Sequence, residues 1–195
     1  SNVISMDSTF QMCHNLQYVS LKGLTEVVSV AYLFNYCYSL VEVNLEDLNS
    51  ATDFTDVFNE CHSLERVRMT GLSEADSELY DLVSSYAPHP KATSLTLEGL
   101  SQVADLSSIF NTIPSSLKGS VTLNGLSSLQ TFDNAFNSCD MLESVTVHGL
   151  DNVTSAADAF DYCYSLQNVH LEGTQNIEVW DYCFYDCRSL REAPR

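Results

Sequence analysis

The sequence predicts an α/β solenoid, in which about seven repeats of roughly 24 residues build one parallel β-sheet. Three observations lead to this fold class: a motif that recurs at a fixed spacing, a short alternating strand pattern in each copy, and apolar residues at every third position after the strand. A single repeat cannot bury its own apolar side, whereas stacked repeats bury a continuous core. We therefore expect residues 1–195 to form a single solenoid domain.

The recurring motif is an aromatic residue followed, at fixed positions, by Cys, Leu, Val and Leu. It begins at Phe10, Phe34, Phe58, Phe136, Phe160 and Phe184, with a spacing of 24 residues inside each run of three. Three residues further on, the same slot holds Cys13, Cys37, Cys61, Cys139, Cys163 and Cys187. Two more copies within residues 73–121 are irregular, with insertions through Pro88-His89-Pro90 and near Ser115-Ser116.

Alternation of apolar and polar residues predicts one short strand in each repeat. We expect strands centred on Leu21, Leu45, Met69, Leu97, Leu123, Val147 and Leu171. A turn residue, usually glycine, follows each strand. The apolar residues after the turn have a period of three, which favours 3₁₀ turns or coil on the convex side. The exception is 74–86 in the fourth repeat, where helical spacing predicts an α-helix that ends before Pro88.

The charge of the chain argues against several classes of partner. The chain has 26 Asp and Glu against 8 Lys and Arg, a net charge of −18. It therefore repels phosphate backbones and anionic lipid, so we expect no nucleic-acid partner. No apolar run reaches the length of a membrane span, so we expect no direct membrane insertion by this segment. We expect the segment to be part of a longer protein that carries the signal and the anchor elsewhere.

The seven cysteines allow three interpretations. Six occupy one slot of the repeat between core Phe and Leu residues, and Cys183 occupies a slot where other repeats have Ala. As free thiols they would pack as small apolar residues, which is the interpretation we adopt. Disulfide bonds are a second interpretation, but the odd count leaves one cysteine over. Metal binding is the third, but it usually uses Cys-x-x-Cys pairs, which the sequence lacks.

The repeat resembles that of a known family. Ala159-Phe160-x-x-Cys163-x-x-Leu166-x-x-Val169-x-Leu171-x-Gly173 is similar to the repeat of the BspA-like, or Treponema pallidum-type, leucine-rich repeat surface proteins. The resemblance extends over nearly the whole chain and implies a right-handed leucine-rich repeat superhelix. It also implies a bacterial cell-surface or secreted protein that takes part in adhesion. Gly or Asp stands after the strand where many members have Pro, and the two irregular repeats lack the Cys.

No catalytic motif accompanies the repeats. The sequence has no Gly-x-Ser-x-Gly elbow, no His-Glu-x-x-His, no phosphate loop and no dinucleotide fingerprint. Carboxylate pairs such as Asp53 and Asp56 are expected in so acidic a chain, and we interpret them as solvated charge. We therefore predict that the protein is not an enzyme and that it uses neither a cofactor nor a metal ion.

The outward positions of the predicted sheet form columns across successive strands and supply the candidate binding residues. Arg66 and Arg68 form a basic doublet on one strand of an acidic protein. The candidate ligand-binding residues are Arg66, Arg68, Lys22, Tyr18, Asn44, Thr96 and His170. The alternative is an ordinary polar sheet face, on which Glu42, Glu46 and Glu98 neutralise the arginines across the rungs.

We therefore predict a non-enzymatic binding module of a bacterial cell-surface or secreted protein. It would recognise a protein, or a glycan, on a host or neighbouring cell through the sheet face. An edge that carries tyrosines, among them Tyr36, Tyr38, Tyr162 and Tyr164, is the second candidate surface. The alternative function is a structural spacer that presents other domains and has no ligand of its own.

Overall fold

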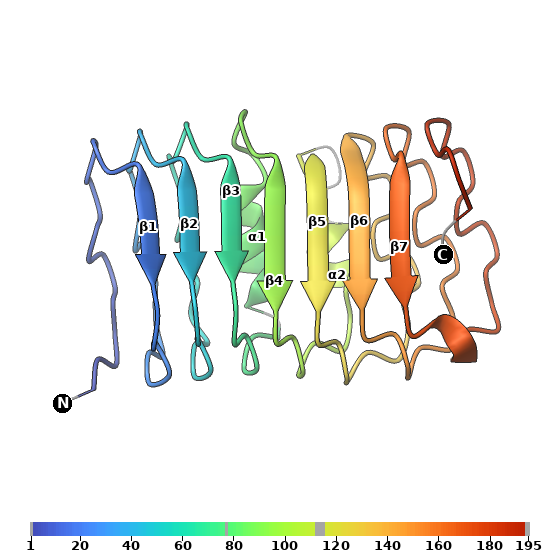
Figure 1. The fold of residues 1–195 in the computed structure, drawn as a ribbon, viewed down its shortest axis with the longest axis horizontal. Coiled ribbons are helices and arrows are strands. Elements are labelled where there is room, and N and C mark those ends of the chain that lie inside the picture. The colour runs from blue at the N-terminus through green and yellow to red at the C-terminus, as the bar shows by residue number, and fades with distance from the viewer. Residues whose placement is uncertain (1, 77, 112–115, 194–195) are drawn as a thin grey trace. The chain divides into compact units, whose positions relative to one another are not determined.

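The computed structural model describes residues 2–76, 78–111 and 116–193, and the chain forms two compact units, Ser1–Leu100 and Ser101–Arg195. In each unit, strands that all run in the same direction are linked by turns that wrap around an apolar core (Figure 1). The predicted α/β solenoid is therefore confirmed. That residues 1–195 behave as a single domain stays a prediction.

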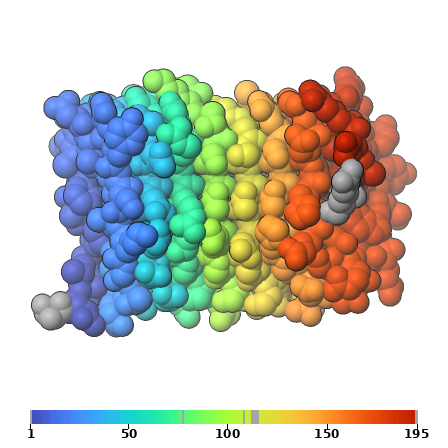
Figure 2. Space-filling view, viewed as in Figure 1, coloured from blue at the N-terminus to red at the C-terminus, as the bar shows by residue number. Residues whose placement is uncertain are grey.

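The first unit, Ser1–Leu100, contains four parallel strands that pair in chain order. They are β1 (Tyr18–Leu21), β2 (Glu42–Leu45), β3 (Arg66–Met69) and β4 (Ser94–Glu98). The register places equivalent positions of successive repeats opposite one another, so that Glu42 lies between Tyr18 and Arg66. The predicted columns of outward side chains are thus present in this unit. In Figure 2 the bands of colour from blue to green are the side chains of successive repeats, packed against one another on this face.

The second unit, Ser101–Arg195, repeats the arrangement with three parallel strands. They are β5 (Gly119–Asn124), β6 (Leu142–His148) and β7 (Asn168–Glu172), preceded by the short helix α2 (Ser107–Phe110) and followed by the 3₁₀ turn η1 (Thr174–Asn176). Each strand pairs with the next in chain order. Every strand predicted from the sequence is present, although β1, β2 and β3 end at their predicted centres, Leu21, Leu45 and Met69.

The turn after each strand needs a residue that accepts a positive φ. Asp47 has a φ of 68° and Gly71 has a φ of 77° in equivalent slots. A Cβ atom on Gly71 would lie 2.8 Å from the backbone nitrogen of Leu48, one repeat earlier. Glycine is therefore required at position 71 for close packing of two backbones as well as for its φ.

Opposite the strands, the chain wraps around the core in short turns with a period of three. In the second repeat, the backbone N–H of Leu33 donates to Val30 O at 3.1 Å and that of Cys37 donates to Phe34 O at 2.9 Å. The residue before each donor, Tyr32 or Tyr36, has a φ of 56° or 61°, so these are type II β-turns rather than 3₁₀ turns. Of the two predicted alternatives, 3₁₀ turns or coil, this segment follows the second. The turns place equivalent side chains of successive repeats in the core. As a result the ring of Phe34 stacks on that of Phe58, with ring centroids 5.9 Å apart.

The predicted helix of the fourth repeat is shorter than expected. Helix α1 spans Leu79–Tyr86 and lies behind β3 and β4, whereas the sequence predicted a start at 74 (Figure 1). Leu72 and Ala75 are fully buried and form a turn like the equivalent turn of the preceding repeat, with the N–H of Ala75 donating to Leu72 O. The helix therefore begins only after this turn. The helix ends before Pro88, as predicted. Helix α2 was not predicted, and the insertion expected near Ser115 lies outside the described residues.

Candidate binding surface

The strand face of the first unit brings most of the candidate residues together. One shallow hollow on this face is lined by Asn44, Arg66, Arg68 and Thr96, and a second is lined by Tyr18 and Asn44. Lys22 lies just after β1 and reaches the same network of charges through Glu46. We call this surface, made of Tyr18, Lys22, Asn44, Arg66, Arg68 and Thr96 with their glutamate partners, the charged strand face.

Arg66 is paired with carboxylates on both sides. Its Nη2 lies 2.9 Å and its Nε 3.2 Å from Glu42 Oε2 on β2, and its Nη1 lies 2.9 Å from Glu65 Oε2. The hydrogen bond to Glu42 is the main cause of a pKa of Arg66 above its usual value. The side chain nevertheless remains 45% exposed, so solvent and a partner molecule can reach it.

Arg68 is held by a second set of partners. Its Nη2 lies 2.9 Å from Glu98 Oε1 on β4, and its Nη1 donates to Asn44 Oδ1 at 3.2 Å on β2. Glu46 joins Lys22 to this group, with its Oε2 3.2 Å from Lys22 Nζ. Hydrogen bonds from Asn44 and then Lys22 lower the pKa of the Glu46 carboxyl.

In these contacts glutamates on neighbouring strands neutralise the charges of the two arginines, which was the alternative predicted from the sequence. Glu42, Glu46 and Glu98 each contact one of the two arginines, and Glu65 is an additional partner. The charged strand face therefore presents both signs of charge in alternation. It is not a simple basic patch, and a ligand must fit the fixed positions of cations and anions together.

The seventh candidate, His170, lies on β7 of the second unit. There the structure groups it with His148, with ring centroids 5.6 Å apart, and with Glu172. His148 and Glu172 were not among the candidate residues predicted from the sequence. The repeat pattern could have indicated this group. His148 and Glu172 occupy equivalent outward positions in successive repeats, and His170 precedes Glu172 by two residues on the same face of the strand.

The cysteines have no role at this surface. All seven are free thiols, and Cys37, Cys61, Cys139, Cys163 and Cys183 are buried. Burial raises the pKa of Cys61 and Cys139 to about 12, which favours the protonated thiols at neutral pH. The expectation of burial is wrong for Cys13, which is exposed because no earlier described repeat packs on it, and Cys187 is half-buried.

The tyrosine-bearing edge packs largely on itself. In the first unit the Tyr38 ring lies between the rings of His14 and His62, with centroids 4.8 and 5.7 Å away. In the second unit the guanidinium carbon of Arg188 lies 4.8 Å from the centre of the Tyr164 ring. These rings are about 40% exposed, but their faces are partly covered by neighbours of the same chain. Free aromatic area on this edge is therefore concentrated at Tyr182 and Tyr185, which are 67% and 52% exposed.

Comparison with known families agrees with the repeat pattern. The family model for the BspA type leucine rich repeat region matches residues 2–82 and 105–194, in six copies. The unmatched residues between these ranges contain the predicted insertion through Pro88-His89-Pro90. No curated protein matches the chain. In the described part of the chain, no helix has both the length and the apolar character needed to cross a lipid bilayer.

Proposed function

Because the chain belongs to the family of proteins with a BspA type leucine rich repeat region, we propose that it is a non-enzymatic binding module of a bacterial cell-surface or secreted protein. Its proposed role is adhesion through recognition of a partner protein on a host or neighbouring cell. The observation that carries this proposal is the charged strand face, where Arg66 and Arg68 project from one rigid strand into a hollow.

The rigidity of the parallel sheet supports this choice of surface. Val67 and Met69 are buried on the inner side of β3, which fixes the backbone from which the two arginines project. A ligand that binds here therefore orders little more than the ends of long side chains, which reduces the entropic cost of binding. Tyr18, which is 64% exposed at the edge of the same face, adds an aromatic contact of the kind enriched at protein interfaces.

The charge pattern favours a protein partner over an anionic glycan. Each guanidinium already contacts at least one carboxylate, and the glutamates of the face outnumber the arginines. A sulfated polymer would be repelled by those glutamates, whereas a protein surface can present both signs at matching positions. Arginine contacts a carboxylate through a planar fork, so the geometry of the partner, as well as its charge, decides the fit.

The test is a binding screen followed by charge-conserving substitutions. The chain is immobilised and probed with a panel of purified extracellular host proteins, and any saturable ligand is then measured against the double variant Arg66→Lys and Arg68→Lys. Lysine keeps the charge but loses the fork, so we expect binding at least about tenfold weaker. Arg188→Lys together with Arg191→Lys is the matched control, and it should leave the affinity unchanged.

The same screen separates the proposed function from the spacer alternative. A spacer has no saturable ligand on any face, so an absence of binding across the whole panel argues for that role. A ligand whose affinity is the same for both double variants would contradict the charged strand face as the site. In that case the tyrosine-bearing edge is the next surface to substitute.

A further inference from the structure

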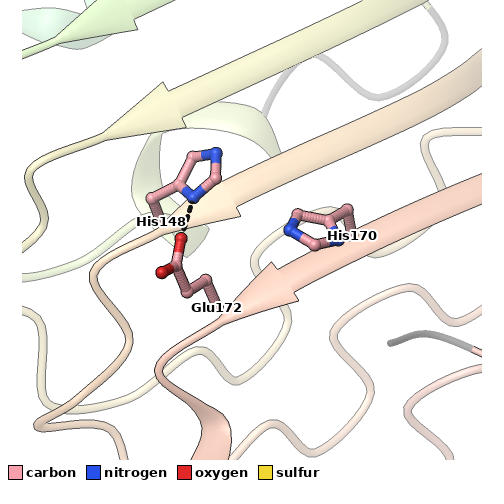
Figure 3. Close-up of side chains that lie close together, drawn as sticks. All are labelled: His148, His170 and Glu172. Carbon is pink, nitrogen blue, oxygen red and sulfur yellow. Dashed lines mark hydrogen bonds and ion pairs between the residues drawn. The ribbon is translucent and has the colours of Figure 1, made fainter.

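Three side chains on the strand face of the second unit converge in a way that the proposed function does not use. His148 is the last residue of β6, and His170 and Glu172 lie two residues apart on β7. The register places His148 directly opposite Glu172. In Figure 3 the Nδ1 atom of His148 bonds to the carboxylate of Glu172, and the His170 ring lies beside this pair.

The potential ligand atoms are close enough to share one metal ion. One ring nitrogen from each histidine and one carboxylate oxygen of Glu172 all lie within 4.8 Å of one another. In a tetrahedral zinc site with bonds of about 2.0–2.2 Å, ligand atoms are separated by roughly 3.5 Å, so small side-chain rotations suffice. Among the residues that the structure describes, this is the one such group of three His, Cys, Asp or Glu side chains.

The backbone beneath these side chains is already in place. Val147 and Leu171 alternate with the three residues and are buried in the core of the second unit. Strands β6 and β7 remain in register up to the His148–Glu172 pair. A site built on paired strands holds its ligands more closely than a site built on loops, so metal binding needs no rearrangement of the fold.

The electrostatic surroundings favour a cation. Glu172 forms a hydrogen bond with His148, and within the described ranges no Lys or Arg pairs with it. Glu192 lines the same shallow hollow as His170, so the residues around this hollow include a further acidic side chain. The net charge of −18 also raises the local concentration of cations around the whole chain.

In contrast to the expectation from the sequence that the protein uses no metal ion, we propose that His148, His170 and Glu172 form a binding site for a divalent transition metal ion of the Zn²⁺ class. Two imidazole nitrogens and one carboxylate oxygen suit Zn²⁺, Ni²⁺ or Cu²⁺, whereas Ca²⁺ and Mg²⁺ prefer sets of oxygen ligands. Three protein ligands leave one coordination position for water. The site stands on geometry in the second unit and does not depend on the ligand proposed for the charged strand face.

Calorimetric titration with Zn²⁺ tests the proposal directly. All samples carry Cys13→Ala, because an exposed thiol beside His14 is itself a potential zinc ligand. We expect one Zn²⁺ per chain, no binding of Ca²⁺, and an affinity lowered at least about tenfold by each of His148→Gln, His170→Gln and Glu172→Gln. His62→Gln is the matched control, since exposed His62 pairs with Glu60 at 2.9 Å but belongs to no such group of three, and it should bind normally.

A second measurement uses the protein with all its histidines intact. In NMR spectra of the imidazole rings, added Zn²⁺ should shift the signals of His148 and His170 and leave those of His14, His62 and His89 in place. The absence of zinc binding would overturn the proposal. So would zinc binding that persists unchanged in the three variants, or ring shifts confined to the other histidines.

Discussion

The thiol of Cys163 donates a hydrogen bond to the backbone carbonyl oxygen of Phe136, one repeat earlier, over 3.1 Å. Cys61 makes the same contact with Phe34 O at 3.1 Å. The recurring Cys is therefore more than a small apolar filler, because its S–H is a second donor to a carbonyl group that already accepts a backbone N–H, that of Cys139 at 3.0 Å in the case of Phe136. The packing interpretation is confirmed for this residue, and the hydrogen bond is an addition to it.

This contact predicts the effect of Cys163→Ser. The hydroxyl keeps the acceptor at Phe136 O, but its shorter bond to Cβ lengthens the hydrogen bond and the buried site loses the apolar sulfur. We expect a loss of about 1–3 kcal/mol in the free energy of unfolding, measured by urea denaturation. Cys13→Ser changes the same slot where it is exposed and should cost almost nothing. Equal losses at both positions would contradict a role for burial.

Thiol labelling tests the burial of the cysteines in the folded protein. We expect a maleimide reagent to modify Cys13 at once, Cys187 more slowly, and the five buried thiols only after unfolding, because the reagent needs an accessible thiolate. Mass spectrometry of peptides identifies the labelled positions. Rapid modification of Cys61 or Cys163 under native conditions would show that the core of the solenoid opens readily.

Asp161→Asn should stabilise the protein. Asp161 Oδ1 is buried and has no hydrogen-bond partner in the described part of the chain. Burial, and then the charge of Asp158, raise the pKa of this carboxyl. The equivalent slot in other repeats holds Asn35 and Asn59, whose amides bond to each other at 3.3 Å. We expect a gain of about 0.5–1 kcal/mol in the free energy of unfolding at neutral pH.

The pH dependence of this gain follows from the sign of the shift. A carboxyl whose pKa is raised in the folded protein destabilises the fold when it is charged. This loss of stability is absent at a pH below the ordinary pKa of 3.8 and fully present at a pH above the raised pKa. The gain from Asp161→Asn should therefore disappear in acid. Asp181→Asn removes the same charge at an exposed position and is the control. An equal gain from both substitutions would assign the effect to net charge alone.

Gly71→Ala and Gly23→Ala form a matched pair that separates backbone conformation from close packing. Both glycines have similar positive φ, 77° and 72°, but only at Gly71 would a new Cβ meet a neighbouring backbone, the nitrogen of Leu48 at 2.8 Å. We expect a loss of about 1 kcal/mol in the free energy of unfolding for Gly23→Ala and of about 2–4 kcal/mol for Gly71→Ala. Thermal denaturation measures both, and equal losses would show that the two backbones can move apart freely.

The arginines of the charged strand face should contribute little to stability. Arg66 and Arg68 are 45% and 43% exposed, and water and salt screen their ion pairs. We expect Arg66→Ala and Arg68→Ala each to lower the free energy of unfolding by about 0–1 kcal/mol, with a smaller loss at high salt. A loss well above this range in denaturation experiments would mean that the network is structural, which would weaken the case for its role in binding.

The recurring pattern alone was enough to predict the strands, their shared direction, the turns with positive φ and the columns of outward residues. The same pattern recurs in each repeat: a strand with apolar residues at every second position, followed by a segment with apolar residues at every third. Both parts of the pattern put their apolar residues on one side of the repeat, and only that side can be buried. The start of α1 was predicted wrongly, at 74 instead of Leu79, because buried Ala75 belongs to a turn whose N–H donates to Leu72 O and which packs against the preceding repeat. In that segment, contacts between repeats outweigh local propensity.

Several side-chain partners were decided only by the tertiary structure. The predicted columns of outward residues placed Arg66 near Glu42, but they did not predict its additional contact with Glu65. The repeat pattern likewise did not predict that the buried Cys163 thiol has a hydrogen-bond acceptor. Likewise, the sequence contains His148, His170 and Glu172 without indicating that their ligand atoms converge. Side-chain rotamers and the spacing between neighbouring strands set these distances, whereas the periodic pattern specifies only which face of the sheet each residue occupies.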